Sequence, residues 1–495
     1  MFNSIFCRKP LRRKATLGYA IFVFAGILGI ILGANILIKA PIAPMFLIIW
    51  LFIYPATMML GYTFEEVNAA MMDSCRNGLG AVLIILAVGA MIATWIAAGT
   101  VPALIYYGLM FINPQYFLLS AFVLCSMVSL ACGTSWGTMG TAGIAMFGVG
   151  ASLGIPPGVT LGAIISGSYL GDMLSPMSDS TNVAAAATGV DLIYHCKQLA
   201  IIVLPISCLT GILFMVIGMQ YSVDTFEASF IGEIMSALSA KFSLGFVAFI
   251  PMIVLLAMLM AKMPAMYSML FSAVVGATVA AMYQGLPADQ TVQVFWNGYV
   301  SDTGHKFIDS LLNRGGVRSM FNPACMMLFA FGMVGAFNTV GILDAVVNPI
   351  IKRVKTVAQL SAISQVISII GNTLGTNTFS LLMTGTLMTP AYHKYGLHPV
   401  NLGKSLNSTS TVICPYIPWN ASGIFVAGMF SVPIANWAPY ALFSYLMPIA
   451  AFLFVLFNFR VIPADPVLVP QPTGGASTET ATGSELESGR VAASQ

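Results

Sequence analysis

The sequence predicts an all-α polytopic integral membrane protein with about ten to twelve transmembrane helices, arranged in two repeated halves. Of the 495 residues, 58% are hydrophobic and only 7% are charged, whereas charged residues make up roughly a quarter of an ordinary soluble domain. The mean hydropathy is +0.89. Apolar runs of about 20 residues, long enough to cross the hydrocarbon core, recur from Ala15 to Arg460. A soluble fold could not bury so much apolar surface.

The first apolar run, residues 15–38, follows a basic segment. That segment contains Arg8, Lys9, Arg12, Arg13 and Lys14. The run is too long for the apolar part of a secretory signal and lacks a cleavage site. Because cations are disfavoured on the translocated side of a membrane, we expect residues 1–14 to form a basic N-terminus in the cytoplasm.

Charged residues and composition divide the chain. A first polar connection contains Glu65, Glu66, Asp73 and Arg76, and a second contains Asp224, Glu227, Glu233 and Lys241. We therefore predict a first transmembrane half at residues 15–222, a central connection at 223–243 and a second transmembrane half at 244–462. Residues 463–495 are rich in Pro, Gly, Ser, Thr and Glu without apolar periodicity, which predicts a disordered tail.

A faint internal repeat relates the two halves. The motif GTSWGT at residues 133–138 corresponds to GTNTFS at 375–380. Counted from its first glycine, the first motif is followed after 43 positions by Pro176, and the second is followed after 40 positions by Pro415. Convergence of two apolar segments is the alternative explanation. Repeated halves of transporters are often inverted in the membrane, with broken helices meeting near the midplane, and we expect that arrangement here.

Two aspartates in an apolar context form the best candidate for a binding site. Asp172 and Asp179 lie in the stretch GDMLSPMSDSTN at residues 171–182, between strongly apolar runs. A carboxylate at membrane depth is costly unless it is paired, hydrated or bound to a cation, so it persists mainly where it has a function. Pro176 argues for a broken helix, because it removes a backbone donor. The alternative is a hydrophilic loop outside the membrane, which the short distance between the apolar flanks disfavours.

An opened helix at this point offers many oxygen atoms. Backbone carbonyls, hydroxyls and an amide together form the kind of shell that hard cations prefer. We expect the polar side chains of this segment, Ser175, Ser178, Thr181 and Asn182, to complete a site around the two aspartates. Na+ and protons suit such a site, so Asp172 and Asp179 are the candidates for binding Na+.

Further polar stretches are candidates for lining the same cavity. They contribute Thr134 and Ser135 in the first half and Thr376, Asn377, Thr411 and Asn420 in the second half. Small residues with hydroxyl groups also favour close helix packing, which is the alternative for the GTSWGT motif. Tyr416 and Trp419 either line a substrate pocket or anchor the chain at the membrane surface. The second-half stretches contain no carboxylate, so the predicted site is charged on one side only.

Several function classes are disfavoured by what the sequence lacks. No Walker-type phosphate loop, zinc-ligand spacing or nucleophile elbow is present. We therefore expect a gradient-driven transporter rather than an enzyme, and no cofactor. The eight cysteines show no metal-ligand spacing, and we interpret them as small apolar residues. Because the basic residues are scattered over connections, no nucleic acid partner is expected.

Five motifs, considered together, resemble those of the NhaC-type Na+/H+ antiporters. They are GTSWGT at 133–138, GDMLSPMSDSTN at 171–182, GYVSDTGHKFIDSLLNRGG at 298–316, GLHPVNL at 396–402 and IPWN at 417–420. The resemblance implies a multi-pass transporter of the bacterial inner membrane that exchanges Na+ for H+, or a relative that exchanges organic acids or amino acids on the same scaffold. It also implies that Asp172 and Asp179 are the carboxylates that bind the ion or proton.

The chain departs from that family pattern in the second half. Sodium-exchanging members look like they carry acidic residues in the stretches matching 375–380 and 407–408, where this sequence has Asn, Thr and Ser. The main interpretation is an Na+/H+ antiporter working by alternating access. The first alternative is an Na+- or H+-coupled amino acid or organic acid porter, and the second is a membrane-embedded scaffold or receptor without transport. The expected partners are the lipid bilayer, Na+, H+ or a small organic solute, and a homodimer is left open.

Overall fold

The computed structural model describes residues 12–38, 42–111, 114–221, 228–301, 315–342 and 354–464, together with residues 309, 312, 313 and 345. Within these ranges the chain is helical and forms no strand, and one isolated bridge joins Leu397 and Pro463. The predicted all-α fold is confirmed. Residues 465–495 of the predicted tail lie outside the described residues, as do Arg8 and Lys9 of the basic N-terminus.

Helices follow one another closely along the chain. The predicted first half contains α1 (Leu17–Ile38), α2 (Ile42–Met58), α3 (Phe64–Ala97), α4 (Thr100–Phe111), α5 (Phe117–Cys132), α6 (Ser135–Thr138), the π-helix η2 (Met139–Gly143), α7 (Ile144–Ser152), α8 (Pro157–Leu174), α9 (Asp179–Thr188) and α10 (Leu192–Gly218). Within the predicted central connection, α11 spans Ala228–Lys241. The predicted second half contains α12 (Ile250–Met260), α13 (Ala265–Met282), α14 (Ala288–Asn297), α16 (Phe321–Val340), α18 (Val357–Leu374), α19 (Asn377–Lys394), α20 (Val400–Leu406), the π-helix η6 (Asn407–Thr411), α21 (Ala421–Phe430), α22 (Ile434–Trp437) and α23 (Leu442–Leu456).

Several of these helices can cross a membrane. Four in the described part of the chain are long and apolar enough, namely α3, α10, α13 and the run Val317–Val340, which includes α16. Three pairs of helices bent by more than 40° at a short break raise the number to seven if each pair is one span. The protein is therefore a multi-pass membrane protein. The total of about ten to twelve spans stays a prediction, because several apolar segments are short or broken.

The predicted first polar connection is instead the N-terminal part of α3. Thr63 and Glu66 form a capping box, in which the Thr63 hydroxyl accepts from the Glu66 N–H at 3.3 Å and the Glu66 carboxylate accepts from the Thr63 N–H at 3.1 Å. Asp73 and Arg76 form an exposed ion pair on the helix surface. The acidic residues therefore begin a long helix rather than a loop.

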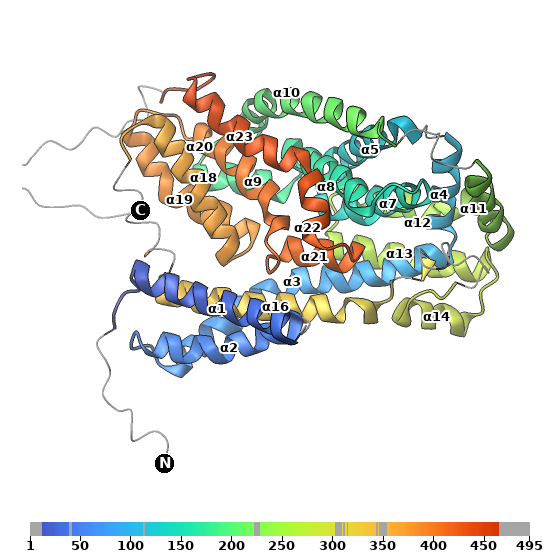
Figure 1. The fold of residues 1–495 in the computed structure, drawn as a ribbon, viewed down its shortest axis with the longest axis horizontal. Coiled ribbons are helices and arrows are strands. Elements are labelled where there is room, and N and C mark those ends of the chain that lie inside the picture. Colours follow the sequence, from blue (N-terminus) through green and yellow to red (C-terminus); the bar gives the residue numbers. More distant parts are fainter. Residues whose placement is uncertain are drawn as a thin grey trace, which may run out of the picture.

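Two groups of helices form the molecule. Figure 1 shows α1, α2, α3 and α16 running together, with α5, α8, α10, α18, α19 and α23 on the other side. The first-half helix α3 packs along the second-half helix α16, so the two halves interlock. Glycine permits this close approach, because a Cβ atom at Gly335 of α16 would lie 2.3 Å from the Ala70 carbonyl oxygen of α3.

The internal repeat is visible where helices break. Thr134 caps α6, and its hydroxyl accepts from the backbone N–H of Gly137 at 3.3 Å. Thr376 caps α19 in the same way, accepting from the N–H of Phe379 at 3.1 Å. Both threonines have extended backbones, as N-cap residues do. The two polar motifs therefore fold into equivalent helix starts.

A second pair of breaks fixes the register of the repeat. Ser178 and Asn420 are the N-cap residues of α9 and α21, and each lies 44 positions after the threonine that caps the preceding break. Each also follows a proline by two positions. The structure thus pairs Pro176 with Pro418, whereas the motif comparison paired it with Pro415. In this register the two halves align without a gap from the first pair of caps, Thr134 and Thr376, to the second pair, Ser178 and Asn420.

The packing of α3 on α16 can be tested with two glycine variants. We expect Gly335→Ala to lower the stability of the purified protein in detergent by about 1–3 kcal/mol, because the added methyl group meets a backbone carbonyl that cannot move aside. Gly80→Ala on α3 is the matched control, since a Cβ there meets nothing within 4 Å. Thermal unfolding followed by size-exclusion chromatography measures both. Equal melting temperatures for the two variants would contradict the described packing.

Candidate functional site

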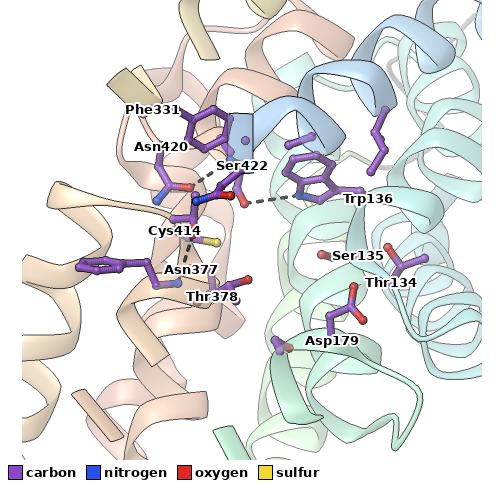
Figure 2. A pocket seen from close by; sticks show the side chains of 18 of the residues that line it. Thr134, Ser135, Trp136, Asp179, Phe331, Asn377, Thr378, Cys414, Asn420 and Ser422 are labelled. Atoms are coloured by element: carbon purple, nitrogen blue, oxygen red, sulfur yellow. Dashed lines mark hydrogen bonds between the residues drawn. The ribbon is translucent and has the colours of Figure 1, made fainter. Parts of the chain in front are cut away.

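A cavity of about 610 Å³ lies between the two groups of helices. α3 and α16 form one wall, and the helix breaks of both halves form the other. Figure 2 shows first-half residues facing second-half residues across this space; those labelled are Thr134, Ser135, Trp136 and Asp179 on one side and Asn377, Thr378, Cys414 and Asn420 on the other. The helix breaks of the two halves therefore meet at one place.

The first-half break separates α8 from α9. The chain is extended at Ser175 (φ −77°, ψ 125°) and at Ser178 (φ −72°, ψ 133°), and Pro176 lies between them. A broken helix at this proline is what the sequence predicts. Non-helical backbone inside a membrane protein is tolerated where it is buried in protein or lines a cavity, and this break lies beside the cavity.

Asp172 is the buried carboxylate of the site, only 7% exposed. It lies in the last turns of α8, and its Oδ1 accepts a hydrogen bond from the Ser178 hydroxyl at 2.5 Å. The Ser178 oxygen lies 2.9 Å from that of Ser180. Both ion pairs found in the described part of the chain involve other residues. A buried carboxylate without a fixed counter-charge is stabilised by a proton or by a bound cation.

Asp179 is the second carboxylate and lines the same cavity. It is exposed at the first position of α9, where the partial positive charge of a helix N-terminus favours a negative side chain. Among the described residues that line the cavity, Asp172 and Asp179 are the only ones with charged side chains. The structure therefore brings together the two aspartates that the sequence singled out.

Three other predicted residues hold the break in place. The Thr181 hydroxyl donates to the Met173 carbonyl oxygen at 3.1 Å, and the Asn182 amide donates to the Pro176 carbonyl oxygen at 3.0 Å. The Ser175 hydroxyl accepts a hydrogen bond from the backbone N–H of Met177 at 3.3 Å. None of Ser175, Thr181 and Asn182 is among the residues that line the cavity. Their hydrogen bonds satisfy backbone groups that the break leaves without helical partners.

The GTSWGT motif reaches the cavity and links the two halves. Thr134 and Ser135 line the cavity, as predicted. Trp136 stacks on Phe425 of the second half, with ring centroids 4.4 Å apart and an interplanar angle of 14°. Its indole N–H also donates to the Ser422 hydroxyl at 3.4 Å. This motif therefore both lines the cavity and packs against the other half.

The second half contributes hydroxyls and amides without a carboxylate. Thr376, Asn377 and Asn420 all line the cavity. The Asn420 amide donates to the carbonyl oxygens of Asn372 and Gly375, at 3.0 Å each, and so ties α21 to the end of α18. The Asn377 side-chain oxygen accepts a hydrogen bond from the Ser410 hydroxyl at 2.8 Å. The predicted charge asymmetry between the two sides is present in the structure.

Three residues considered from the sequence lie behind the cavity wall. The Thr411 hydroxyl donates a hydrogen bond to the Asn407 side-chain oxygen at 2.8 Å. The Tyr416 hydroxyl donates to the Ala441 carbonyl oxygen at 3.1 Å, and the Trp419 indole donates to the Thr373 carbonyl oxygen at 2.8 Å. Tyr416 and Trp419 thus satisfy carbonyl groups next to α23 and in α18, Thr411 bonds to a side chain, and none of the three lines the cavity.

Sequence reasoning missed part of the wall. Ser74 and Asn77 of α3 and Asn338 of α16 line the cavity, and the Tyr169 hydroxyl oxygen lies 3.5 Å from the Cys414 sulfur. In the sequence, the polar residues of α3 indicate a connection between helices, so they do not identify this wall of the cavity. Tyr169 lies in an apolar stretch, and Cys414 lies in the polar second-half stretch but has the residue type of a small apolar group, so only the folded arrangement reveals them.

A second cavity of about 500 Å³ lies at one end of α16. Its wall includes Lys14, Thr16, Tyr62 and Thr339. Asn338 lines both this cavity and the central one, so the two adjoin at that residue. Lys14, the last cation of the basic segment, therefore lies beside a cavity that adjoins the one lined by the aspartates.

The donor set suits a weakly held, transported cation. Within the described ranges no group of three or more His, Cys, Asp and Glu side chains gathers at metal-binding distance. A cation at Asp172 would be held by a carboxylate together with neutral oxygen atoms, such as those of Ser135 and Ser180 in the cavity wall. Oxygen ligands with little net charge fit a hard monovalent ion that must also leave.

Comparison with known proteins gives the family. A model described as the Na+/H+ antiporter family matches residues 11–201 and 167–459. This chain belongs to the Na+/H+ antiporter family. A malate-2H(+)/Na(+)-lactate antiporter of Bacillus subtilis is 33% identical over 88% of this chain and 93% of that protein. The Na(+)/H(+) antiporter NhaC of Alkalihalophilus pseudofirmus is 30% identical over 90% of this chain and 96% of its own length.

Relatives that are named for other substrates also match this chain over most of their length. The arginine/ornithine antiporter ArcD of Halobacterium salinarum is 28% identical over 83% of this chain and 85% of that protein. The resemblance to NhaC-type antiporters is confirmed, and the chain is a membrane transporter of the antiporter type. Its relatives share this scaffold while their names give different cargoes.

Asn420 offers a test of the second-half break. We expect Asn420→Ala to destabilise the antiporter by about 1–3 kcal/mol and to reduce transport, because two buried carbonyl oxygens lose their donor and α21 loses its cap. Asn297→Ala, at the exposed end of α14, is the control. Melting temperature in detergent and flux in proteoliposomes are the measurements. A variant as stable and active as the control would show that Asn420 does not hold the break.

Proposed function

We propose that this antiporter exchanges Na+ for H+ at Asp172 and Asp179 by alternating access. The observation that carries the proposal is the buried Asp172 carboxylate, which lines the central cavity without a fixed counter-charge in the described part of the structure. The proposed location is a bacterial inner membrane, with the basic N-terminus in the cytoplasm. No resident cofactor takes part, and Na+ and H+ are cargo.

Competition for one carboxylate explains the coupling. An ionised carboxylate within a membrane protein is disfavoured by about 2.5–3.5 kcal/mol on insertion scales, so the loaded states are those in which Asp172 carries either a proton or a cation. A proton and Na+ cannot occupy the same oxygen atoms together. Each ion therefore displaces the other, and a gradient of one drives movement of the other.

A second candidate function is supported by the size and polarity of the cavity. A volume of about 610 Å³ far exceeds that of a single ion and falls in the range of small-molecule pockets. The second-half wall offers neutral amides and hydroxyls, from Asn377, Thr378 and Ser422 among others. An Na+- or H+-coupled amino acid or organic acid porter would use this wall for its solute. The names of the malate/lactate and arginine/ornithine relatives agree with such a use of the scaffold.

Proton flux from proteoliposomes that enclose a pH-sensitive dye tests the main proposal. We expect Na+ or Li+ to release protons in the wild type, and Asp172→Asn to reduce this response to the level of protein-free vesicles, because an amide can neither bind a proton nor offset a cation. Asp179→Asn should weaken it. Asp289→Asn, outside the cavity at the start of α14, is the control and should leave the response intact.

The same assay separates the two candidates. Flux that appears only when an amino acid or a carboxylate is added, with no response to Na+, Li+ or K+ alone, would replace the ion exchanger with the solute porter. Exchange that survives in both Asp172→Asn and Asp179→Asn would rule out the aspartates as the site for either function.

A further inference from the structure

Cys414 occupies the second-half position that Asp172 occupies in the first half. Asp172 lies six positions before Ser178, the N-cap residue of α9, and Cys414 lies six positions before Asn420, the N-cap residue of α21. The two positions are also equally far from the preceding break, 38 positions after the threonine that caps it. No gap is needed anywhere between the breaks.

The second aspartate has a neutral counterpart as well. Asp179 is the first residue of α9, and Ala421 is the first residue of α21. All four side chains, those of Asp172, Asp179, Cys414 and Ala421, line the same cavity. The fold therefore repeats the geometry of the carboxylate site, and the second copy lacks both carboxylates.

The surroundings of Cys414 show that its thiol does not substitute for a carboxylate. The side chain is 1% exposed, its sulfur donates to the Thr411 carbonyl oxygen at 3.1 Å, and it lies 3.5 Å from the Tyr169 hydroxyl. A buried thiol behaves as a small apolar group with weak hydrogen bonding. It supplies neither the charge nor the oxygen atoms that a hard cation requires.

The rest of the second-half site is retained. Thr376 and Asn420 still cap the helices at the break, and Asn377 and Ser422 still line the cavity. Among the cavity-lining positions paired by the repeat, those of Asp172 and Asp179 are the ones where a charged side chain faces a neutral counterpart. A carboxylate offsets the charge of a bound cation directly, whereas neutral oxygens do so only through their dipoles, so a second-half wall without carboxylates is a much weaker cation site although the cavity is present.

We propose that Cys414 and Ala421 set the number of cations that this antiporter binds, restricting it to one locus at Asp172 and Asp179. The proposal rests on the proposed function, since it assumes that the two aspartates bind a cation. It goes beyond that function by assigning a specificity role to two uncharged residues. Restoring a carboxylate at either position creates a second cation locus related to the first by the internal repeat.

Binding of radioactive Na+ to the purified protein in detergent counts the loci directly. We expect the wild type to bind one Na+ per chain at saturation. Cys414→Asp and Ala421→Asp should each bind two, and the cation dependence of their proton flux should become sigmoidal. Asp172→Cys, which copies the second half into the first, should bind none.

Neutral replacements separate charge from polarity. Cys414→Asn and Ala421→Asn introduce a side chain of the same size as aspartate but without its negative charge. The number of Na+ ions bound by these variants should stay at one. Ala421→Asp also guards against misfolding of Cys414→Asp, since an acidic residue at the first position of a helix is favourable. Size-exclusion profiles and melting temperatures verify that each variant is folded.

The outcomes distinguish this inference from the proposed function. Two Na+ per wild-type chain, or a count that stays at one in a folded Ala421→Asp variant, would overturn the inference while leaving an exchanger at Asp172 in place. A wild type that binds no Na+ would overturn both. A count that rises from one to two in the acidic variants alone would establish it.

Discussion

The burial of the Asp172 carboxylate is the constraint on which the rest of the site depends. A charge at this depth is stable only if the chain supplies hydrogen bonds and leaves room for a proton or cation. The Ser178 hydroxyl supplies one such bond, and it can do so because the helix breaks at Pro176 and turns back toward α8. The break, in turn, has its backbone carbonyls satisfied by Thr181 and Asn182.

The same physical requirement shapes the second half, where the charge is missing. Backbone groups at membrane depth must find partners whether or not an ion binds. Asn420 meets this requirement by bonding to the end of α18, and Thr376 does so by capping α19. Two breaks with equivalent caps therefore persist although only one carries carboxylates. The fold of such a site and its ionic content can change independently.

Much of this arrangement could be predicted from the sequence, because it follows from local chemistry. The apolar runs predict the helical membrane fold, and Pro176, close to Asp172 in the sequence, predicts the broken helix. What could not be predicted depends on contacts between distant segments. Ser175, Thr181, Asn182 and Thr411 have the residue types of ligands, yet the folded chain uses them to satisfy backbone groups or a neighbouring side chain. The packing of α3 on α16, which adds a wall of the cavity, leaves no local pattern at all.

The cavity beside the N-terminal segment has a consequence for how fast ions arrive. It adjoins the central cavity at Asn338, and Lys14 is part of its wall. A cation that took this path would pass the like charge of Lys14 before it met the aspartates, whereas an anion would be attracted there. Such long-range forces are screened over about 10 Å at 0.1 M salt. Entry by this path would therefore depend on ionic strength, while retention would depend on the buried carboxylate.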